Sequence, residues 1–331
     1  MTNQISIIGA GSWGTALAQA ISSKGTPVIL WTRSLEQADI INSAGENPAC
    51  LPGVTLSKNI TATTNLPDAA KSPILLIVTP AQAVRSTLES LKPHLTPEQC
   101  LIHCSKGIEL DSGKFISDIS QEILPQTPCA ILTGPNFAHE IARGLPAATT
   151  LACADEAVSE KLQIAIASKT FRPYLTDDLI GAQLAGALKN VIAIACGIAH
   201  GLSLGESARA SLVTRGLAEI VRLGAVLGAR PETFMGLSGI GDLMLTCSSI
   251  QSRNFSLGAA LGQGETLAAI LESRRAVTEG VHTARAAHNL AQKNKIDMPI
   301  CTAVHKCLNE ALPIDAALKE MLNRPLGKEY E

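Results

Sequence analysis

Short apolar runs alternate with helix-like stretches along the first half of the chain. Residues 5–8 and 28–31 form the first two runs, and an alanine-rich, helix-like segment separates them. Further runs follow, each after a helix-like segment, and this alternation is typical of a doubly wound α/β fold with a parallel sheet. The other predicted strands are 74–78, 100–104, 130–132, 147–152 and a short extended piece at 171–174.

After residue 178 the pattern changes to long helical runs with few strand signals. The sequence therefore predicts two domains: a Rossmann-type domain over 1–178 and an all-helical domain over 179–331. The boundary is expected near residues 178–190, and the cleft between the domains is the natural place for an active site. The predicted helices are 180–199, 208–227, 266–273, 281–293 and 302–308.

The first predicted strand runs directly into a glycine-rich turn over residues 9–14, and a helix follows. In such a turn Gly9 permits the tight bend, Gly11 lets the backbone approach a pyrophosphate, and Gly14 lets the helix pack against its strand. The unpaired N–H groups at the start of the helix would then face the phosphates. The spacing alone is weak evidence, but with a strand before it and a helix after it the turn predicts a dinucleotide site.

The residues just after the second predicted strand, Thr32 and Arg33, should reach the adenosine ribose of that dinucleotide. An acidic side chain there would accept from the 2′-hydroxyl, whereas an arginine donates to a 2′-phosphate. Arg33 therefore favours NADP(H), with NAD(H) still possible because Glu36 lies close by. A solvated surface arginine is the alternative interpretation.

Composition and charge exclude several other classes of function. The chain has 331 residues, of which 46% are hydrophobic, and a net charge of -2, so it has no basic field for nucleic acid. Its nine cysteines are odd in number and form no Cys-x-x-Cys pair, which indicates reduced, buried thiols in a cytosolic protein. A metal site is not expected.

The most apolar region, residues 179–204, is predicted to be a buried core helix. Polar residues such as Gln183 and His200 interrupt it before it reaches the length of apolar chain that a membrane span needs. The N-terminus has no basic segment, apolar segment and small-residue cleavage site of the kind that directs export. We therefore expect a cytoplasmic protein without a membrane span.

Lys189 is the first candidate for chemistry, because its predicted helix is apolar on almost every side. A buried ammonium group is costly unless it is paired or faces a wet cleft, and desolvation would lower its pKa toward the range useful for proton transfer. The alternative is a lysine whose stem reaches the surface. Lys106, in the loop after a predicted strand, is a second cation near the same cleft, and the two would make an electropositive pocket for an anion.

Two later segments carry further polar groups. Asp242 stands between glycines and an apolar stretch, an arrangement that suggests a tight, ligand-facing loop. Ser252, Arg253 and Asn254 together offer a hydroxyl, a guanidinium and an amide, the donors expected for a phosphate ester. Either segment alone could equally be a helix cap or a turn.

In combination, these motifs are recognisable. The chain resembles the NAD(P)-dependent glycerol-3-phosphate dehydrogenases of the bacterial type, nearly from end to end. Seven blocks in the same order carry the resemblance: residues 9–16, 105–109, 134–138, 187–190, 239–243, 251–254 and 279–281.

The resemblance implies reduction of dihydroxyacetone phosphate by NAD(P)H to sn-glycerol 3-phosphate, for phospholipid synthesis, by a homodimer. It implies Lys189 as the proton donor or acceptor, in contact with the substrate. Along the dinucleotide it places Gly9, Gly11, Ser12, Trp13, Gly14, Arg33, Lys106, Ala138, Arg253, Val277 and Glu279; on the substrate it places Lys106, Gly134, Asn136, Asp242, Ser252, Arg253 and Asn254.

Two positions depart from the family pattern. Asn136 stands where serine or threonine is usual, and Cys50 stands where an aromatic residue is common. The amide of Asn136 can still donate to a substrate oxygen, but with a different geometry, and Cys50 removes an aromatic contact with the cofactor.

Two other functions remain open at this point. One is another dehydrogenase with a Rossmann and a helical domain, acting on a hydroxyacyl thioester or a sugar acid, although no His/Glu catalytic pair is evident. The other is an NADPH-sensing regulator without hydride transfer, for which Lys189 would be dispensable.

Overall fold

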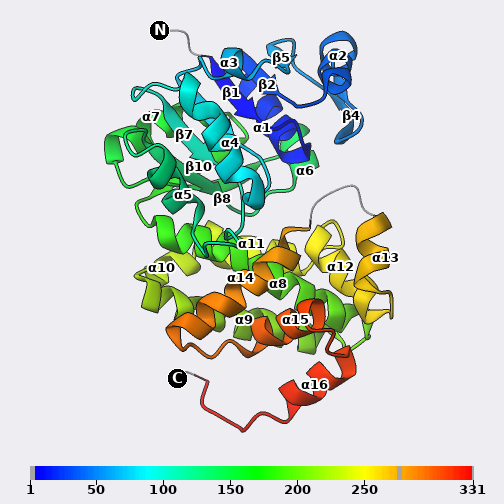
Figure 1. Ribbon diagram of the computed structural model, residues 1–331. Helices are drawn as coiled ribbons and strands as arrows, with labels where there is room; N and C mark the ends of the chain where they lie inside the picture. The colour runs from blue at the N-terminus through cyan, green and yellow to red at the C-terminus, as the bar shows by residue number, and fades with distance from the viewer. Residues whose placement is uncertain (1–3, 274–277, 330–331) are drawn as a thin grey trace.

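The computed structural model describes residues 4–273 and 278–329, which form two lobes joined end to end (Figure 1). The upper lobe contains an eight-stranded sheet with the strand order β10-β9-β8-β7-β6-β1-β2-β5. The predicted doubly wound α/β architecture is therefore confirmed. Its strands are β1 (Ile5–Ile8), β2 (Val28–Trp31), β5 (Ile60–Thr63), β6 (Ile74–Ile77), β7 (Cys100–His103), β8 (Cys129–Thr133), β9 (Ala147–Ala152) and β10 (Phe171–Thr176).

The sheet departs from the expected parallel arrangement at one pair, because β9 runs antiparallel to β8. The connection between them, residues 134–146, contains only the five-residue helix α6 (Ala138–Ala142). To form a parallel neighbour, the chain must cross back to the end of the sheet where the first strand began, usually through a full helix. This short connection instead turns the chain back beside β8, and α7 (Glu156–Ile166) then makes the crossover to the parallel strand β10.

Both faces of the sheet are buried, as its continuous apolar strands predict. Neighbouring residues of β1 enter different clusters: Ile7 packs with Leu17 of α1, and Ile8 packs with Leu88 of α4. The helices of this lobe are α1 (Ser12–Ser22), α2 (Leu35–Ala44), α3 (Leu66–Ala69), α4 (Val84–Leu91), α5 (Ile116–Ile123), α6 and α7, with short 3-10 turns at Ala81–Ala83 and Lys92–His94.

Three strands of this lobe were not predicted from the sequence. β5 is short and half exposed, and its Ile-Thr-Ala-Thr sequence gives little apolar signal. The other two, β3 (Glu46–Asn47) and β4 (Leu51–Thr55), form a small antiparallel hairpin with a proline and a glycine inside β4.

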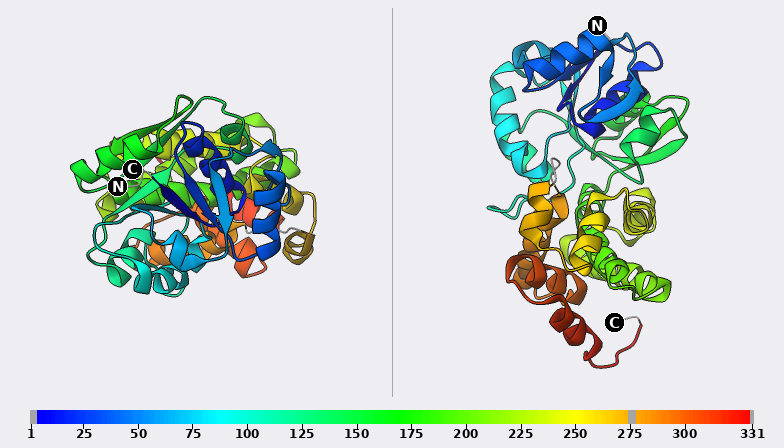
Figure 2. Two further views of the ribbon diagram at one scale, coloured as in Figure 1. Left: turned by 90° about the horizontal axis from the view of Figure 1, so that it is seen from above. Right: turned by 90° about the vertical axis from the view of Figure 1, so that its right-hand side faces the viewer.

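The lower lobe is helical throughout the part that the structure describes, as predicted, and it is built around α8 (Leu179–Gly201) (Figure 2). The predicted helices appear as α8, α9, α13, α14 and α15, while α10, α11, α12 and α16 were not predicted. The further bounds are α9 (Glu206–Leu227), α10 (Pro231–Phe234), a π-helical turn at Leu237–Gly241, α11 (Asp242–Cys247), α12 (Arg253–Gly262), α13 (Leu267–Ser273), α14 (Glu279–Asn294), α15 (Pro299–Asn309) and α16 (Ile314–Leu322).

The helix α12 escaped prediction because glycines lower helix propensity. In the structure, Gly258 and Gly262 serve a close contact between α12 and α8, since a Cβ at Gly262 would lie 2.5 Å from the carbonyl oxygen of Ile198. A Cβ at Gly258 would overlap the carbonyl oxygen of Ile194. Tertiary packing thus overrides local preference at this helix.

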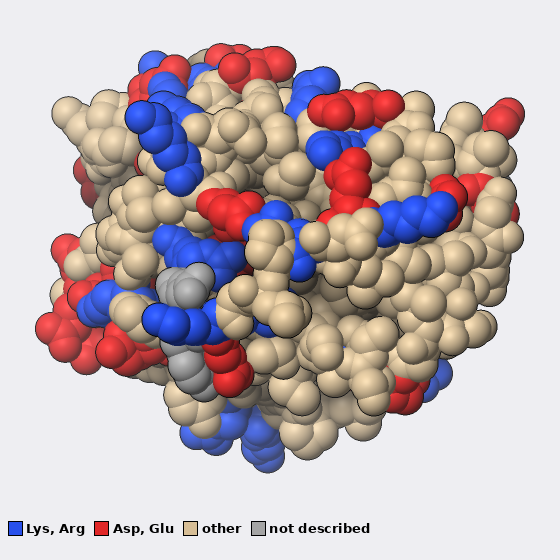
Figure 3. All heavy atoms as spheres, turned by 90° about the horizontal axis from the view of Figure 1, so that it is seen from below, with Lys and Arg blue, Asp and Glu red and all other residues tan. Residues whose placement is uncertain are grey.

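By length and composition, one helix within the described ranges, α8, could cross a membrane. In the structure 89% of its most apolar window is buried inside the protein, so α8 is the core helix that the sequence predicts. Among the described residues on the face seen from below, lysine and arginine side chains lie interspersed with aspartate and glutamate (Figure 3).

Candidate active site

The glycine-rich turn between β1 and α1 has no room for side chains at two of its three glycines. Gly9 has a φ of +122°, and a Cβ there would lie 2.7 Å from the carbonyl oxygen of Val78. A Cβ at Gly14 would overlap the carbonyl oxygen of Gly9. At Gly11, by contrast, a Cβ would meet no atom within 4 Å. Gly9 and Gly14 therefore permit the turn itself, whereas Gly11 faces open space where a ligand can approach.

The start of α1 fits a pyrophosphate. Its N-cap residue, Gly11, makes no side-chain capping bond, so the first N–H groups of the helix keep their donors for a ligand. Ser12 is exposed and its hydroxyl donates to the carbonyl oxygen of Cys50 at 2.5 Å, while Trp13 packs against the core of the lobe. Cys50 thus contributes backbone and a small side chain to the rim of this turn.

Arg33 is exposed, directly after β2. The next helix, α2, begins with Ser34 as its N-cap, whose hydroxyl accepts from the N–H of Gln37 at 3.1 Å. Gln37 in turn ties this loop to the glycine-rich turn, because its amide donates to the carbonyl oxygen of Ala10 at 2.9 Å. The backbone that carries Arg33 is therefore anchored, and its guanidinium lies at the surface.

Two lysines and one carboxylate meet where the two lobes join. Lys106, after β7, donates to Asp242 Oδ2 at 2.6 Å and to the carbonyl oxygen of Gly134 at 3.1 Å. Lys189, on α8, donates to Asp242 Oδ1 and to Thr246 Oγ1, the latter at 2.8 Å. Asp242 is 1% exposed, so its charge is compensated by the two ammonium groups rather than by water.

The two lysines differ in environment. Lys189 is 7% exposed, and burial lowers its pKa to about 8, although the carboxylate of Asp242 acts in the opposite direction. The side chain of Lys106 is 21% exposed. The predicted burial of Lys189 is thus present, and with two cations against one carboxylate the cluster keeps a net positive charge that suits an anionic substrate.

Local sequence explains how these groups are brought together. Gly186 lies one turn before Lys189 on α8, and a Cβ there would lie 2.7 Å from Thr133 Oγ1 at the end of β8. The missing side chain lets the core helix of one lobe approach the sheet of the other. Asp242 occupies the first turn of α11, where the helix dipole favours a carboxylate.

Next to this cluster, α12 begins with the polar group found in the sequence. Ser252 is its N-cap, and the hydroxyl accepts from the N–H of Phe255 at 3.2 Å. Arg253 is exposed at the first position of the helix. Asn254 is buried and bonded to Asn190 on α8, at 2.8 Å, and to the N–H of Gly280, at 3.0 Å. The three residues therefore lie together at a helix start beside α8.

Glu279, at the start of α14, contacts the upper lobe. Its Oε1 accepts from the N–H of Ala81 at 3.2 Å, and its buried Oε2 has no hydrogen-bond partner among the described residues. Burial raises the pKa of this carboxyl, against the effects of the Ala81 N–H and of the positive charge on Arg253. The preceding residue of the predicted set, Val277, lies outside the described residues.

The loop after β8 carries Gly134, Asn136 and Ala138. A Cβ at Gly134 would lie 2.9 Å from the Cα of Thr149, so this glycine allows a close approach to β9. The amide nitrogen of Asn136 donates to the carbonyl oxygens of Pro135 and Ala148, at 2.8 and 3.0 Å. Both of its N–H groups thus hold the loop, and a direct bond from this amide to a substrate stays a prediction. Ala138 is the first residue of α6.

Residues 4–159 match the family described as NAD-dependent glycerol-3-phosphate dehydrogenase N-terminus, and residues 178–319 match the corresponding C-terminus. The chain belongs to the NAD-dependent glycerol-3-phosphate dehydrogenase family. It is 51% identical over 326 residues to a glycerol-3-phosphate dehydrogenase (NAD(P)+) of Parvibaculum lavamentivorans, an alignment that covers 98% of each chain.

Solved structures agree with this family membership. The crystal structure of the glycerol-3-phosphate dehydrogenase from Coxiella burnetii superposes with a TM-score of 0.93 at 38% identity, covering 97% of this chain and 99% of that one. A ketopantoate reductase from Ralstonia eutropha shares the fold with a TM-score of 0.62 at 14% identity, covering 95% of this chain and 99% of that one. Fold alone therefore does not select the substrate, and the site residues must do so.

Two polar residues that contact the candidate site residues were missed in the sequence. Thr246 lies four residues after Asp242, so both share a face of α11. Because α11 was not predicted from the sequence, this i, i+4 relation went unnoticed. Asn190 directly follows Lys189, and its contact with Asn254 joins positions 64 residues apart, which no local pattern indicates.

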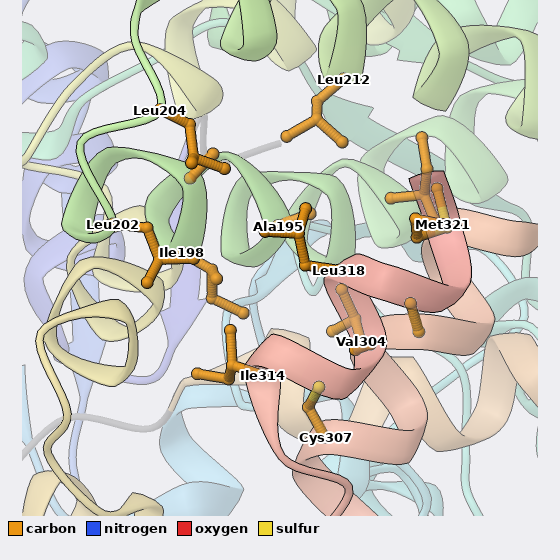
Figure 4. Close-up of a pocket in the computed structure, with 14 residues that line it drawn as sticks. Ala195, Ile198, Leu202, Leu204, Leu212, Val304, Cys307, Ile314, Leu318 and Met321 are labelled. Carbon is orange, nitrogen blue, oxygen red and sulfur yellow. The ribbon is translucent and has the colours of Figure 1, made fainter. Parts of the chain in front are cut away.

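An apolar cavity lies between α8, α9, α15 and α16 (Figure 4). It has a volume of about 510 Å³ including its open mouth, and its lining includes Ile198 in the C-terminal half of α8 and Leu202 directly after that helix. At a rise of about 1.5 Å per residue, the lining residue of α8 nearest to Lys189 in sequence, Ala195, lies roughly 9 Å along the helix from it. None of Lys106, Lys189 and Asp242 lines the cavity, so it is separate from the lysine cluster.

Proposed function

We propose that this chain reduces dihydroxyacetone phosphate to sn-glycerol 3-phosphate with NAD(P)H, reversibly. The observation that carries the proposal is a pair of salt bridges between the lobes, in which Lys106 and Lys189 share the buried carboxylate of Asp242. It joins a proton carrier of lowered pKa to a positively charged pocket beside the polar start of α12. Family membership supports the same reaction.

The dinucleotide fits the uncapped start of α1, where Gly11 leaves space and the helix N–H groups are donors. When bound, the nicotinamide supplies the hydride for the C2 carbonyl of the substrate. We assign cofactor binding to residues 1–178 and substrate binding to residues 179–331, with Lys106, Gly134 and Asn136 reaching the substrate from the first part. Arg33 would pair with a 2′-phosphate, which favours NADP(H) over NAD(H).

Lys189 is the proton carrier in this proposal. As an ammonium group it donates the proton that the C2 oxygen needs to become a hydroxyl, and in the reverse direction the neutral amine takes that proton back. Asp242 and Thr246 fix the position of Nζ by accepting from it. Burial lowers the pKa of Lys189 to about 8, so both protonation states are accessible near neutral pH.

The phosphate would bind at the start of α12. Arg253 offers a charged, forked donor, and Asn254 has a second amide N–H beyond the one that it gives to Asn190. The hydroxyl of Ser252 accepts from Phe255 and still has its own hydrogen to donate. Holding the phosphate in this way orients the carbonyl toward Lys189 and toward the cofactor.

A dehydrogenase for hydroxyacyl thioesters or sugar acids is less well supported. The histidine–carboxylate ion pair within the described ranges joins His305 to Glu310, at the end of α15 and outside the lysine cluster. A regulator without hydride transfer would have no use for a proton carrier held in place by a buried carboxylate.

We further propose that the product supplies glycerophospholipid synthesis, and that the enzyme works as a cytoplasmic homodimer. All nine cysteines are free thiols in the structure, which suits a reducing compartment. Light scattering on the purified protein tests the dimer, since a single species of one chain's mass would contradict it.

The decisive experiment is the loss of NADPH absorbance with three additions: dihydroxyacetone phosphate, unphosphorylated dihydroxyacetone, or neither. We expect turnover with the phosphate ester, far slower turnover with dihydroxyacetone and none without a ketone. Equal rates with the two ketones would contradict the proposed phosphate site. No turnover with either ketone would contradict the proposed dehydrogenase activity.

A further inference from the structure

A chain of buried polar contacts connects the predicted substrate side of the site with the predicted cofactor side. Asn254, beside Arg253, donates to Asn190 Oδ1 at 2.8 Å. The other amide atom, Asn254 Oδ1, accepts from the N–H of Gly280 at 3.0 Å. Asn190 and Asn254 are only 5% and 8% exposed, and Gly280 is buried, so water has little access to these bonds.

The absence of a side chain at Gly280 is what allows this contact. A Cβ there would lie 2.6 Å from Asn254 Oδ1 and 2.9 Å from the carbonyl oxygen of Asn190. It would also lie 2.8 Å from Cδ1 of Ile194, one turn further along α8. The first turn of α14 is therefore in direct contact with both asparagines, and none of the three can move far without moving another.

Each end of this chain of contacts lies next to a group with an assigned role. Asn190 follows Lys189 in sequence, and Gly280 follows Glu279, whose Oε1 accepts from the N–H of Ala81 in the upper lobe. The other carboxylate oxygen, Oε2, is buried without a hydrogen-bond partner among the described residues. Gly280 thus joins Asn254, through one hydrogen bond and the backbone, to a carboxylate with one oxygen that no described residue bonds.

We propose that Gly280 is a positioning residue that, with Asn254 and Asn190, couples phosphate binding at α12 to dinucleotide binding at the other lobe. The proposal rests on the function proposed above. Binding of a phosphate ester fixes Asn254, which fixes the start of α14 and so the position of Glu279. Because coupling between two sites is reciprocal, each ligand then tightens the binding of the other.

The test measures the affinity for NADPH with and without sn-glycerol 3-phosphate. Both molecules are the reduced partners of the reaction, so neither can oxidise the other and no turnover occurs. Binding is followed by the fluorescence of the reduced nicotinamide. In the unmodified protein we expect sn-glycerol 3-phosphate to tighten NADPH binding by about fivefold or more, the usual range of such coupling. In Gly280→Ala and in Asn190→Ala the factor should fall below about twofold.

Gly262→Ala is the matched control. It adds the same methyl group to a similarly crowded glycine, 2.5 Å from the carbonyl oxygen of Ile198, but far along α12 from Asn254. It should lose stability as Gly280→Ala does and yet retain the full coupling factor. Asn190→Ala introduces no clash, so it keeps the test decisive if Gly280→Ala does not fold.

Unchanged coupling in both Gly280→Ala and Asn190→Ala, or no coupling in the unmodified protein, would overturn the proposal. Loss of coupling in Gly262→Ala as well would also overturn it, since destabilisation would then explain the effect. Turnover of dihydroxyacetone phosphate by the unmodified protein is measured in parallel. The proposed function fails only if that turnover is absent, so the two outcomes stay distinguishable.

Discussion

Two helices of this protein begin at proposed phosphate sites, and they are built in opposite ways. The first, α1, begins after Gly11 without any side-chain cap, so its N–H groups are left for a ligand. The second, α12, begins after Ser252, whose hydroxyl already accepts from the N–H of Phe255. Backbone groups are the donors at α1, whereas side chains take over part of that role at α12.

This difference between backbone and side-chain donors determines which substitutions each site can accept. At α1 close packing forbids a Cβ at Gly9 and Gly14, and the sequence of glycines is the recognition element. At α12 recognition depends on particular functional groups, above all the guanidinium of Arg253, and these can discriminate a phosphate ester from a plain ketone. Neither helix start supplies the proton that the proposed reaction needs, which is the role of Lys189.

The largest effect is expected for Lys189→Met, which keeps the aliphatic stem and removes the proton. Loss of a positioned acid typically costs on the order of 10² to 10⁴ in rate, and the loss should appear in kcat while NADPH binding survives. Lys293→Met, at an exposed position of α14, is the control and should be unaffected. If folded Lys189→Met kept more than about a tenth of the kcat, Lys106 would be the better candidate for the acid.

Arg253→Gln should break the α12 site while leaving the α1 site intact. A charge-assisted bond contributes about 1.5 to 3 kcal/mol, so we expect the KM for dihydroxyacetone phosphate to rise by roughly 10- to 150-fold. The preference for dihydroxyacetone phosphate over unphosphorylated dihydroxyacetone should be largely lost. Steady-state kinetics with both ketones measure this, with Arg172→Gln on the exposed face of β10 as the control. An unchanged preference for the phosphate ester would remove Arg253 from the phosphate site.

Arg33→Ala tests the other end of the dinucleotide. Loss of a charge-assisted contact with a 2′-phosphate should weaken the binding of NADPH by about tenfold or more and leave the binding of NADH nearly unchanged. Values of kcat/KM for the two cofactors measure the difference. Equal losses for NADPH and NADH would contradict the assignment of Arg33 to the 2′-phosphate.

Ser252→Ala is expected to have the smallest effect, and it sharpens the contrast between the helix starts. Loss of an N-cap hydroxyl costs about 1 kcal/mol in the free energy of unfolding, and Ser252→Thr should restore most of it. Unfolding in urea measures both variants. If Ser252→Ala unfolded at the same urea concentration as the unmodified protein, the capping bond would contribute nothing to the stability of α12.

The two helix starts also differ in how far the sequence predicts them. The turn before α1 is a local pattern, because its three glycines, its strand and its helix are consecutive, and the dinucleotide site is predicted from it. At α12 the sequence shows the donors Ser252, Arg253 and Asn254 but not the helix, since its two glycines lower the local propensity and only the contact with α8 explains them.

The lysine cluster was predicted only in part, for the same physical reason. Burial of Lys189 follows from its apolar helix, but the sequence gives no sign that Asp242, 53 residues away, accepts from it. Lys106 entered the predicted site as a cation in the loop after a strand, and Asp242 entered it as a carboxylate beside glycines. The family resemblance then implied their contacts with the substrate. The antiparallel β9 and the bonds of Asn136 to its own loop depend on the length and path of one connection, which residue patterns do not report.

The most direct test of the central claim, that Lys189 carries the proton, is the pH dependence of kcat in both directions. Burial lowers the pKa of Lys189 to about 8, and reduction needs the protonated form whereas oxidation needs the neutral form. The rate of dihydroxyacetone phosphate reduction should therefore fall as pH rises through about 8, while the rate of glycerol 3-phosphate oxidation should rise over the same interval. Two profiles that are flat there, or that move in the same direction, would contradict the account.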